Sequence, residues 1–139
     1  MAGHCETFDH TADVGLQATA DTLGELFEAL AEGMADFICP RGKVAAAQTR
    51  ELIIRAEDVE ALVVDFLCKV LNVIQTDRFV IAGVSVKEIT GQSVRAEVSG
   101  ERYDPLRHEL HTEVKAVTYH LLKVAREGGQ WLGRVVLDL

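Results

Sequence analysis

Residues 22–42, TLGELFEALAEGMADFICPRG, contain the clearest helical pattern in this chain of 139 residues. Apolar side chains recur every three or four positions, which is the spacing of one helix face. They are Leu23, Leu26, Phe27, Leu30, Met34, Phe37 and Ile38. Thr22 and Glu25 form the S/T-x-x-E pattern of a capping box, and Pro40 and Gly42 follow the last apolar position. This stretch predicts an amphipathic helix that needs an apolar surface to pack against.

A second helix is predicted after Asp58, which is suited to cap it. Its apolar stripe consists of Val59, Leu62, Val63, Phe66, Leu67, Val70 and Ile74. The remaining segments alternate like strands. They are residues 6–20 with a polar break at 9–13, residues 43–56, a hairpin over 79–98 and a hairpin over 122–139. Residues 100–113 are polar and predict a loop, whereas residues 115–120 fit either a short helix or a strand.

Helices and hairpins come in blocks rather than in strict alternation. This order favours an α+β fold, with a two-layer arrangement of a mainly antiparallel β-sheet packed against two amphipathic helices. The length predicts a single domain over residues 1–139. The sequence has neither a secretory signal nor an apolar run near the roughly 20 residues of a membrane-spanning helix. Three widely spaced cysteines, Cys5, Cys39 and Cys68, predict reduced, structural thiols, and a cytoplasmic protein without a membrane partner is expected.

The charge balance bears on the kind of partner. The chain has 14 basic and 22 acidic residues, which give a formal net charge of −8. Proteins that hold nucleic acid by themselves gather Lys and Arg against phosphates, whereas the basic residues here are scattered as single positions. Direct nucleic-acid binding is therefore not expected, and a cation or a basic protein surface is the more natural partner.

Two segments near the chain ends carry carboxylates. Residues 9–13, Asp-His-Thr-Ala-Asp, interrupt two strands, although Asp and Thr in such a turn often bond only to nearby backbone. Asp138 lies in an apolar strand beside the α-carboxylate of Leu139, or is simply exposed on a frayed end. If Asp13 approached Asp138, either a carboxyl would take up a proton or a cation would neutralise the cluster. Oxygen-only ligands favour Ca²⁺ over Mg²⁺ or Mn²⁺.

Lys115 stands between apolar residues in the segment Lys-Ala-Val-Thr-Tyr-His, residues 115–120. It is either a surface lysine whose stem covers apolar groups or a cation directed at phosphate or carboxylates. His108 and His111 lack a third ligand nearby in sequence, so a zinc site there is not expected. The sequence also lacks a glycine-rich phosphate loop, a nucleophile elbow and an HExxH motif.

Taken in order, these segments resemble the archease family. Residues 9–15, DHTADVG, look like its N-terminal DHTAD motif, and residues 115–120, KAVTYH, resemble its KAxTYH segment. Asp138 and Leu139 match its acidic penultimate and apolar last residue, and residues 22–27 and 100–101 look like further landmarks. The resemblance runs from residue 8 to residue 139.

The resemblance implies a two-layer α+β fold and a protein that is not itself an enzyme. Archeases act on an RtcB-type RNA ligase, which joins RNA ends in tRNA splicing and RNA repair with GTP and a divalent metal. They promote guanylylation of the ligase and its multiple turnover. By motif position, Asp13, Asp138 and a terminal oxygen of Leu139 would bind the metal. Lys115 would serve ligase activation, and Asp9 and His10 would have supporting roles, with His10 orienting the carboxylates.

Two other functions remain open on the sequence. One is a chaperone or modulator of RNA-modifying enzymes, such as a tRNA methyltransferase, which would need a large exposed apolar patch. The other is a small metal-dependent phosphohydrolase that uses Asp9, His10, Asp13 and Asp138. That activity would need an open coordination position and a substrate pocket.

Overall fold

The computed structural model describes residues 3–9 and 13–139. These residues form two helices and seven strands. The helices are α1 (Leu23–Ile38) and α2 (Val59–Thr76), and a 3-10 turn, η1 (Arg41–Lys43), follows α1. The strands are β1 (His4–Asp9), β2 (Asp13–Ala20), β3 (Gln48–Arg55), β4 (Phe79–Ile89), β5 (Ser93–Arg102), β6 (Ala116–Glu127) and β7 (Gln130–Asp138). The α+β class predicted from the sequence is confirmed.

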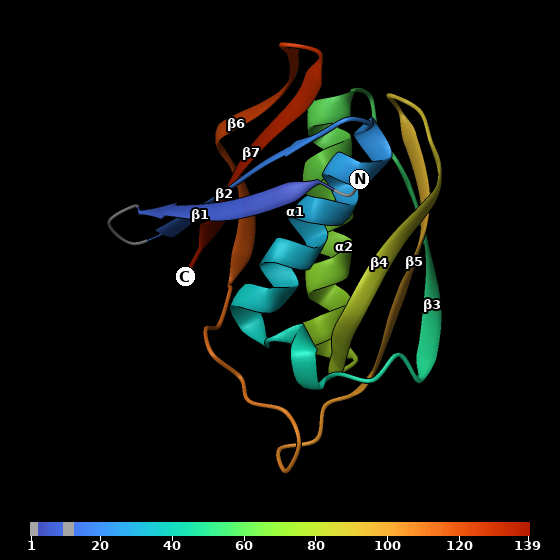
Figure 1. Ribbon diagram of the computed structural model, residues 1–139, viewed down its shortest axis with the longest axis vertical. Coiled ribbons are helices and arrows are strands. Elements are labelled where there is room, and N and C mark those ends of the chain that lie inside the picture. Colours follow the sequence, from blue (N-terminus) through green and yellow to red (C-terminus); the bar gives the residue numbers. More distant parts are fainter. Residues whose placement is uncertain (1–2, 10–12) are drawn as a thin grey trace.

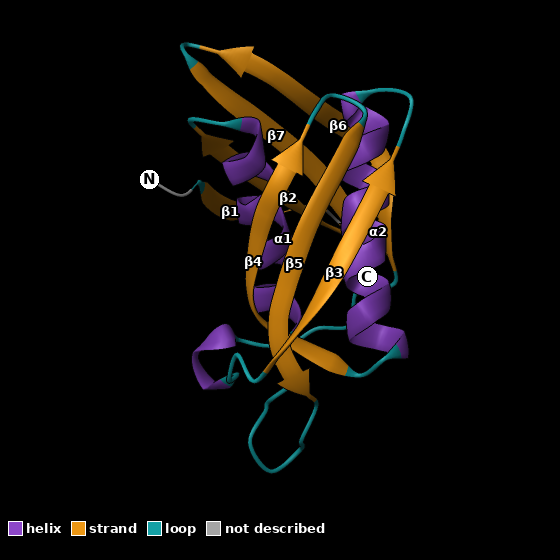
Figure 2. Ribbon diagram, turned by 90° about the vertical axis from the view of Figure 1, so that its right-hand side faces the viewer, coloured by secondary structure: helices purple, strands orange, loops and turns teal. Residues whose placement is uncertain are grey.

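The strands form two antiparallel sheets, one of four strands in the order β1-β2-β7-β6 and one of three in the order β3-β5-β4. Figures 1 and 2 show α1 and α2 between these sheets, so the molecule has three layers where the sequence predicted two. The reason is that both helices bury residues beyond the predicted stripes, including Ala31 in α1 and Val64 and Leu71 in α2. A helix with such a wide apolar surface can be covered on two sides. In the described part of the chain, neither helix is long and apolar enough to cross a bilayer.

Both helices begin where the sequence predicted. The Thr22 hydroxyl accepts a hydrogen bond from the Glu25 amide at 3.1 Å, and the Asp58 carboxylate accepts one from the Ala61 amide at 2.8 Å. Each cap satisfies an amide in the first turn that has no partner within the helix. Local sequence therefore fixes the start of both helices before any tertiary packing is considered.

Strand β4 lies at the edge of the three-stranded sheet, and α1 covers part of that edge. The Glu28 carboxylate accepts a hydrogen bond from the Val86 amide at 2.8 Å, and the Glu32 carboxylate accepts one from the Val84 amide at 3.0 Å. Burial raises the pKa of Glu28, although the bond from Val86 opposes the shift. Covering an edge in this way satisfies amides that could otherwise pair with another chain.

Three predicted boundaries differ from the structure. Strand β3 begins at Gln48 rather than at residue 43, because the chain first makes the 3-10 turn η1, whose Arg41 is bound to Asp36. Strand β5 continues to Arg102, three residues into the predicted loop. Residues 116–120 are strand, and the pairing of β6 with β7 is irregular between Thr118 and Lys123.

The three cysteines are free, as predicted, but their surroundings differ. Cys39 is buried, Cys5 is partly buried and Cys68 is exposed. Burial raises the pKa of the Cys5 thiol to about 12, with a further contribution from the carboxylates of Glu6 and Asp36. A thiol with so high a pKa is a poor nucleophile at neutral pH, which agrees with a packing role for Cys5.

Candidate metal site between two strands

Strands β2 and β7 bring the start of β2 beside the C-terminal end of β7, at one end of the four-stranded sheet. In their antiparallel register, Asp13 lies directly opposite Asp138. Residues opposite each other in such a pair project to the same face, with Cβ atoms about 4.5–5.5 Å apart. The structure thus brings these two predicted site residues together, and Figure 1 shows the C-terminus beside β2 and β6.

The carboxylates belong to the face of the sheet that is turned away from the helices. Leu16 and Leu137 are fully buried against the helices, and side chains alternate between faces along a strand. Asp13 and Asp138 therefore share the outer face with Gln17 and Arg134. There the Arg134 guanidinium donates two hydrogen bonds to the Gln17 side-chain oxygen, at 3.1 and 2.7 Å. Both aspartates are partly exposed, so a cation or a partner can reach them.

Lys115 is tied to the same place through its backbone. Its amide donates a hydrogen bond of 2.7 Å to the Asp138 carbonyl, and the next residue, Ala116, pairs with Asp138 in the β6–β7 ladder. The Lys115 side chain is exposed and lines a cavity at the carboxyl ends of the two helices. Three predicted site residues thus lie near one another. Asp13 begins β2, Asp138 ends β7, and Lys115 directly precedes β6. Leu139 follows Asp138 and is half-buried.

Asp9 and His10 are the two residues expected to support the site, and the structure describes only the backbone of Asp9. The backbone of Asp9 ends β1 and pairs with Val14, which places it next to Asp13 in the ladder. His10 and the side chain of Asp9 lie outside the described residues. Their supporting roles therefore stay predictions.

The donor chemistry at this place suits a hard cation. Like charges directly opposite each other in a ladder are destabilising, and carboxylate and carbonyl oxygens are the ligands that Ca²⁺ prefers. Among the described residues there is no group of three or more His, Cys, Asp or Glu side chains that could hold a metal. A cation at Asp13 and Asp138 would therefore need main-chain oxygens, such as one from Leu139, and water to complete its coordination. Ca²⁺ tolerates such an irregular set better than Mg²⁺ does.

A buried acid that the sequence singled out only as a family landmark, Glu101, is the centre of a cluster of charged and polar groups. Its carboxylate accepts two hydrogen bonds from the Arg107 guanidinium, at 2.9 and 2.6 Å. The Ala45 amide and His108 Nε2 also bind it, at 2.8 and 2.9 Å. His108 Nδ1 accepts the Asp104 amide, so the ring proton lies on Nε2 and is donated to Glu101.

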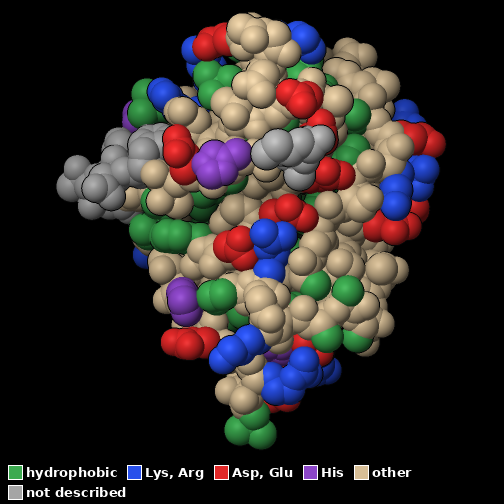
Figure 3. Space-filling model, viewed as in Figure 1, with side chains coloured by type: hydrophobic (Ala, Val, Ile, Leu, Met, Phe, Trp, Pro, Cys, Tyr) green, Lys and Arg blue, Asp and Glu red, His purple; other side chains and the backbone are tan. Residues whose placement is uncertain are grey.

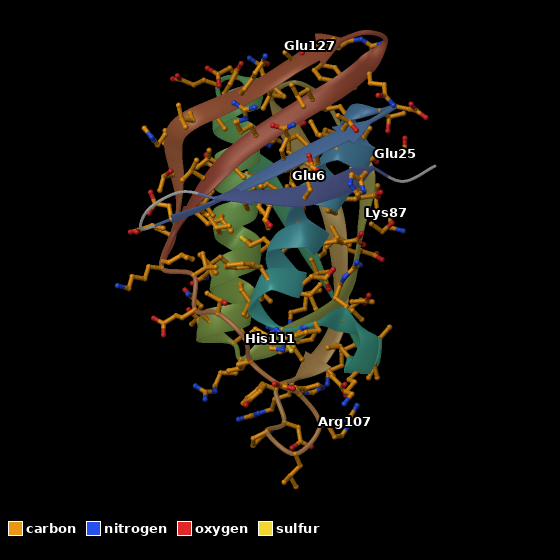
Figure 4. The ribbon with its side chains drawn as sticks, turned by 60° about the vertical axis from the view of Figure 1, so that its left-hand side comes forward. Glu6, Glu25, Lys87, Arg107, His111 and Glu127 are labelled. Atoms are coloured by element: carbon orange, nitrogen blue, oxygen red, sulfur yellow. The ribbon has the colours of Figure 1, made fainter. Side chains whose placement is uncertain are left out.

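This cluster fixes the loop of residues 103–115, at whose outer end Figure 4 shows Arg107. The hydrogen bonds from Arg107, then those from Ala45 and His108, lower the pKa of Glu101 to about 2. His108 was considered in the sequence only as a zinc ligand, and it serves instead as a buried partner of Glu101. No periodic signal connects Glu101 with Arg107 and His108 in sequence, because a loop rather than a helix brings them together.

Comparison with known proteins assigns this arrangement to a family. The model of the Archease protein family matches residues 5–139. The chain belongs to the archease family. Protein archease of Methanosarcina acetivorans is 37% identical over an alignment of 138 positions, which covers 96% of this chain and 94% of that protein. Protein archease of Pyrococcus abyssi is also 37% identical, over 96% of this chain and 97% of its own length.

Solved archease structures share the fold. The solution structure of Methanobacterium thermoautotrophicum protein 1598 has 34% sequence identity and a TM-score of 0.83, and it covers 97% of this chain and 98% of its own. The crystal structure of an archease from Thermotoga maritima, described as a possible chaperone, has 22% identity and a TM-score of 0.64 over 96% of both chains. At this lower identity the second structure supports the fold alone. The names of these archeases state no catalysed reaction.

Proposed function

We propose that this archease is a metal-binding protein cofactor that activates an RtcB-type tRNA-splicing RNA ligase, by promoting its guanylylation and multiple turnover. The observation that carries the proposal is the β2–β7 register, which sets Asp13 opposite Asp138 beside the Lys115 backbone. Membership of the archease family supports the choice of partner. The motifs that contain these residues are those through which the chain resembles archeases.

In this proposal the divalent cation is held by the Asp13 and Asp138 carboxylates and by an oxygen of Leu139. Ca²⁺ is the first candidate, with Mg²⁺ and Mn²⁺ as alternatives. The reason is that all of the proposed donors are oxygen atoms, and Ca²⁺ tolerates an irregular arrangement of them. The bound cation offsets the repulsion between the two carboxylates. It also fixes the ends of β2 and β7 relative to each other, which gives the site one defined shape.

Lys115 extends the site beyond the metal ligands. Because its amide is bonded to the Asp138 carbonyl, the position of its ammonium group depends on the strand that carries Asp138. A lysine in this place can contact a phosphate or a carboxylate of the ligase. If this surface binds the nucleotide- and metal-loaded ligase more tightly than the empty ligase, it shifts the population toward the loaded state.

The surface charge agrees with a protein partner rather than with RNA. Figure 3 shows acidic and basic side chains interspersed over one face, with no continuous basic track. The formal net charge of −8 opposes direct binding of a nucleic-acid backbone. The proposed partner is therefore the ligase itself, and the RNA is bound by the ligase.

The test is a multiple-turnover RNA ligation with an RtcB-type ligase, GTP and metal, in which the chain is present or absent. The wild-type chain is expected to increase product beyond one equivalent of ligase, and Asp138→Ala is expected to remove at least nine-tenths of that stimulation. Asp65→Ala, an exposed aspartate on α2, is the matched control and should stimulate like the wild type. Equal stimulation by Asp138→Ala and the wild type would refute the proposed site.

The two alternative functions receive less support. A general chaperone would need a contiguous apolar surface, whereas the exposed large apolar side chains are divided among β3, the loop of residues 103–115 and β6. A phosphohydrolase would need its acids at a pocket, and neither Asp13 nor Asp138 lines the cavity beside Lys115. Phosphatase and phosphodiesterase assays with Mn²⁺ are expected to detect no turnover.

A further inference from the structure

The cavity beside Lys115 has a volume of about 730 Å³ and lies where the two helices end. Its walls are mainly apolar and come from four parts of the chain: α1, α2, the start of β4 and the loop of residues 103–115. The apolar lining residues are Ile38, Ile74, Val80, Tyr103, Leu110 and Val114. A volume of this size falls within the range of pockets that hold ligands or several side chains.

The loop that closes the cavity is held to the rest of the molecule on both sides. The Tyr103 amide donates to the Arg78 carbonyl at 2.7 Å, and the His111 amide donates to the Ile38 carbonyl at 2.8 Å. The Gln75 side chain donates to the Val114 carbonyl. Figure 4 shows His111 beside the ends of the helices. The cavity is therefore formed before any partner binds, which lowers the entropic cost of binding.

The rim of the cavity is basic on a molecule that is acidic as a whole. Arg78 and Lys115 line it together with His111, against a single carboxylate from Glu113. Among the described residues, neither the Arg78 nor the Lys115 side chain forms an ion pair. The local charge favours an anionic occupant even though the net charge is −8.

We infer that this cavity, lined by Arg78, Leu110 and Lys115, is the docking site for an exposed segment of the partner ligase that carries a large apolar side chain flanked by Asp or Glu. The apolar side chain would enter between Ile74 and Val80, and the acidic groups would meet the Arg78 and Lys115 cations. This inference rests on the proposed function and adds to it the surface by which the partner binds.

Two observations favour a protein segment over a nucleotide. Leu110 stands at the rim with 53% of its surface exposed, and an apolar partner group would cover it. Tyr103 is the only Phe, Tyr or Trp among the described lining residues, and its ring is already 6.0 Å from the His108 ring, which leaves less of it for a base to stack on. The cavity is also near the candidate metal site, because Lys115 lines the cavity and its amide is hydrogen-bonded to the Asp138 carbonyl. A segment bound here would hold the ligase against Asp13 and Asp138.

The experiment measures the affinity of the full chain for an RtcB-type ligase in the presence of Ca²⁺, by isothermal titration calorimetry. Leu110→Asp and Arg78→Glu are expected to weaken binding at least tenfold. The matched controls are Leu106→Asp, which is in the same loop but 93% exposed and outside the cavity, and Arg55→Glu, which makes the same charge change on β3. Both controls should bind within twofold of the wild type, and circular dichroism should show that all four variants are folded.

A photo-cross-linking residue at position 110 should capture a ligase peptide in which Asp or Glu flanks a large apolar residue. Binding by Leu110→Asp and Arg78→Glu that equals the wild type, while Asp138→Ala still loses stimulation, would overturn the docking site and leave the proposed function standing. A wild-type chain that neither binds nor stimulates the ligase would overturn both. Saturable binding of GTP to the isolated chain, with NMR shifts confined to the lining residues, would show a nucleotide pocket and overturn the protein occupant.

Discussion

Two acidic places in this molecule both lie on strands, yet they differ in the groups that surround their charges. Glu101 at the end of β5 meets a guanidinium, an imidazole N–H and a backbone amide. Asp13 and Asp138 meet each other across the β2–β7 ladder. The first arrangement satisfies a buried carboxylate inside the fold. The second sets two like charges opposite each other, and a bound cation would offset their repulsion.

Glu101 and the two aspartates also differ in what their charges contribute to folding. The donors around Glu101 fix the 103–115 loop, so its charge contributes to the folded state itself. The aspartates lie on the outer face of a sheet whose core side is already filled by Leu16 and Leu137. Their charges contribute little to packing there, and they are placed where a cation and a partner can reach them.

The largest expected difference between the two places is the response to Ca²⁺. Ca²⁺ at 100 times its dissociation constant should raise the free energy of unfolding of the wild type by about 2.7 kcal/mol, because it binds only the folded chain. The Asp138→Asn variant should gain almost nothing, whereas Glu101→Ala should keep the gain. Thermal melts with Ca²⁺ and with EDTA provide the measurement. An equal shift in wild type and Asp138→Asn would place the cation elsewhere.

Removal of Glu101 should reduce stability more than removal of any exposed acid. In Glu101→Ala, His108 Nε2 keeps its proton in a buried position without its acceptor, which costs about 1–3 kcal/mol. Urea denaturation should show a lower midpoint for Glu101→Ala. Glu97→Ala on the same strand, which breaks only a half-exposed contact with Lys87, should cost less than about 1 kcal/mol. Equal midpoints for the two variants would refute a special role for Glu101.

Protonation of Glu101 should have a smaller effect than its deletion, because a neutral carboxyl keeps an acceptor oxygen. The folded-state pKa is about 2, below the value of about 4.3 for an unfolded glutamate, so the folded state binds fewer protons. The stabilisation from the ionised form is therefore fully present above about pH 4.3 and is lost as the pH falls toward 2. The stability difference between wild type and Glu101→Gln should shrink over that window. A difference that stays constant from pH 6 to pH 2 would contradict the lowered pKa.

Local signals in the sequence predicted the helices and hairpins well. The caps at Thr22 and Asp58 and the 3.6-residue apolar period act within one element, and they gave both helix starts. The division of strands between two sheets depends on contacts between distant elements, and no local pattern contains it. Gly100 illustrates this limit, because a Cβ there would lie 1.9 Å from the Val80 carbonyl oxygen of the neighbouring strand. The sequence contained the glycine but not the close approach that requires it.

The candidate site could be predicted from the sequence for a different reason. Asp13 and Asp138 each lie at a strand end near a chain terminus, and the resemblance to archeases connected them before their pairing was known. The cavity beside Lys115 and the cluster around Glu101 were missed. Their residues come from several elements and from a loop that is fixed by charged and backbone hydrogen bonds, so neither has a period or a motif of its own.

The smallest expected effect is a change in the free energy of unfolding without metal. It tests most directly the contrast between Glu101 and the two aspartates. In EDTA, Asp138→Asn should stabilise the chain by about 0.2–1 kcal/mol, because it removes one of two like charges at nearly the same side-chain volume. Glu101→Gln under the same conditions should destabilise it, since the charge removed there is matched by Arg107. The opposite signs, measured by urea denaturation at low ionic strength, distinguish the two places without reference to any partner. If both substitutions destabilised the metal-free chain, Asp138 would belong with Glu101 among the structural acids, and the case for a cation between β2 and β7 would fail.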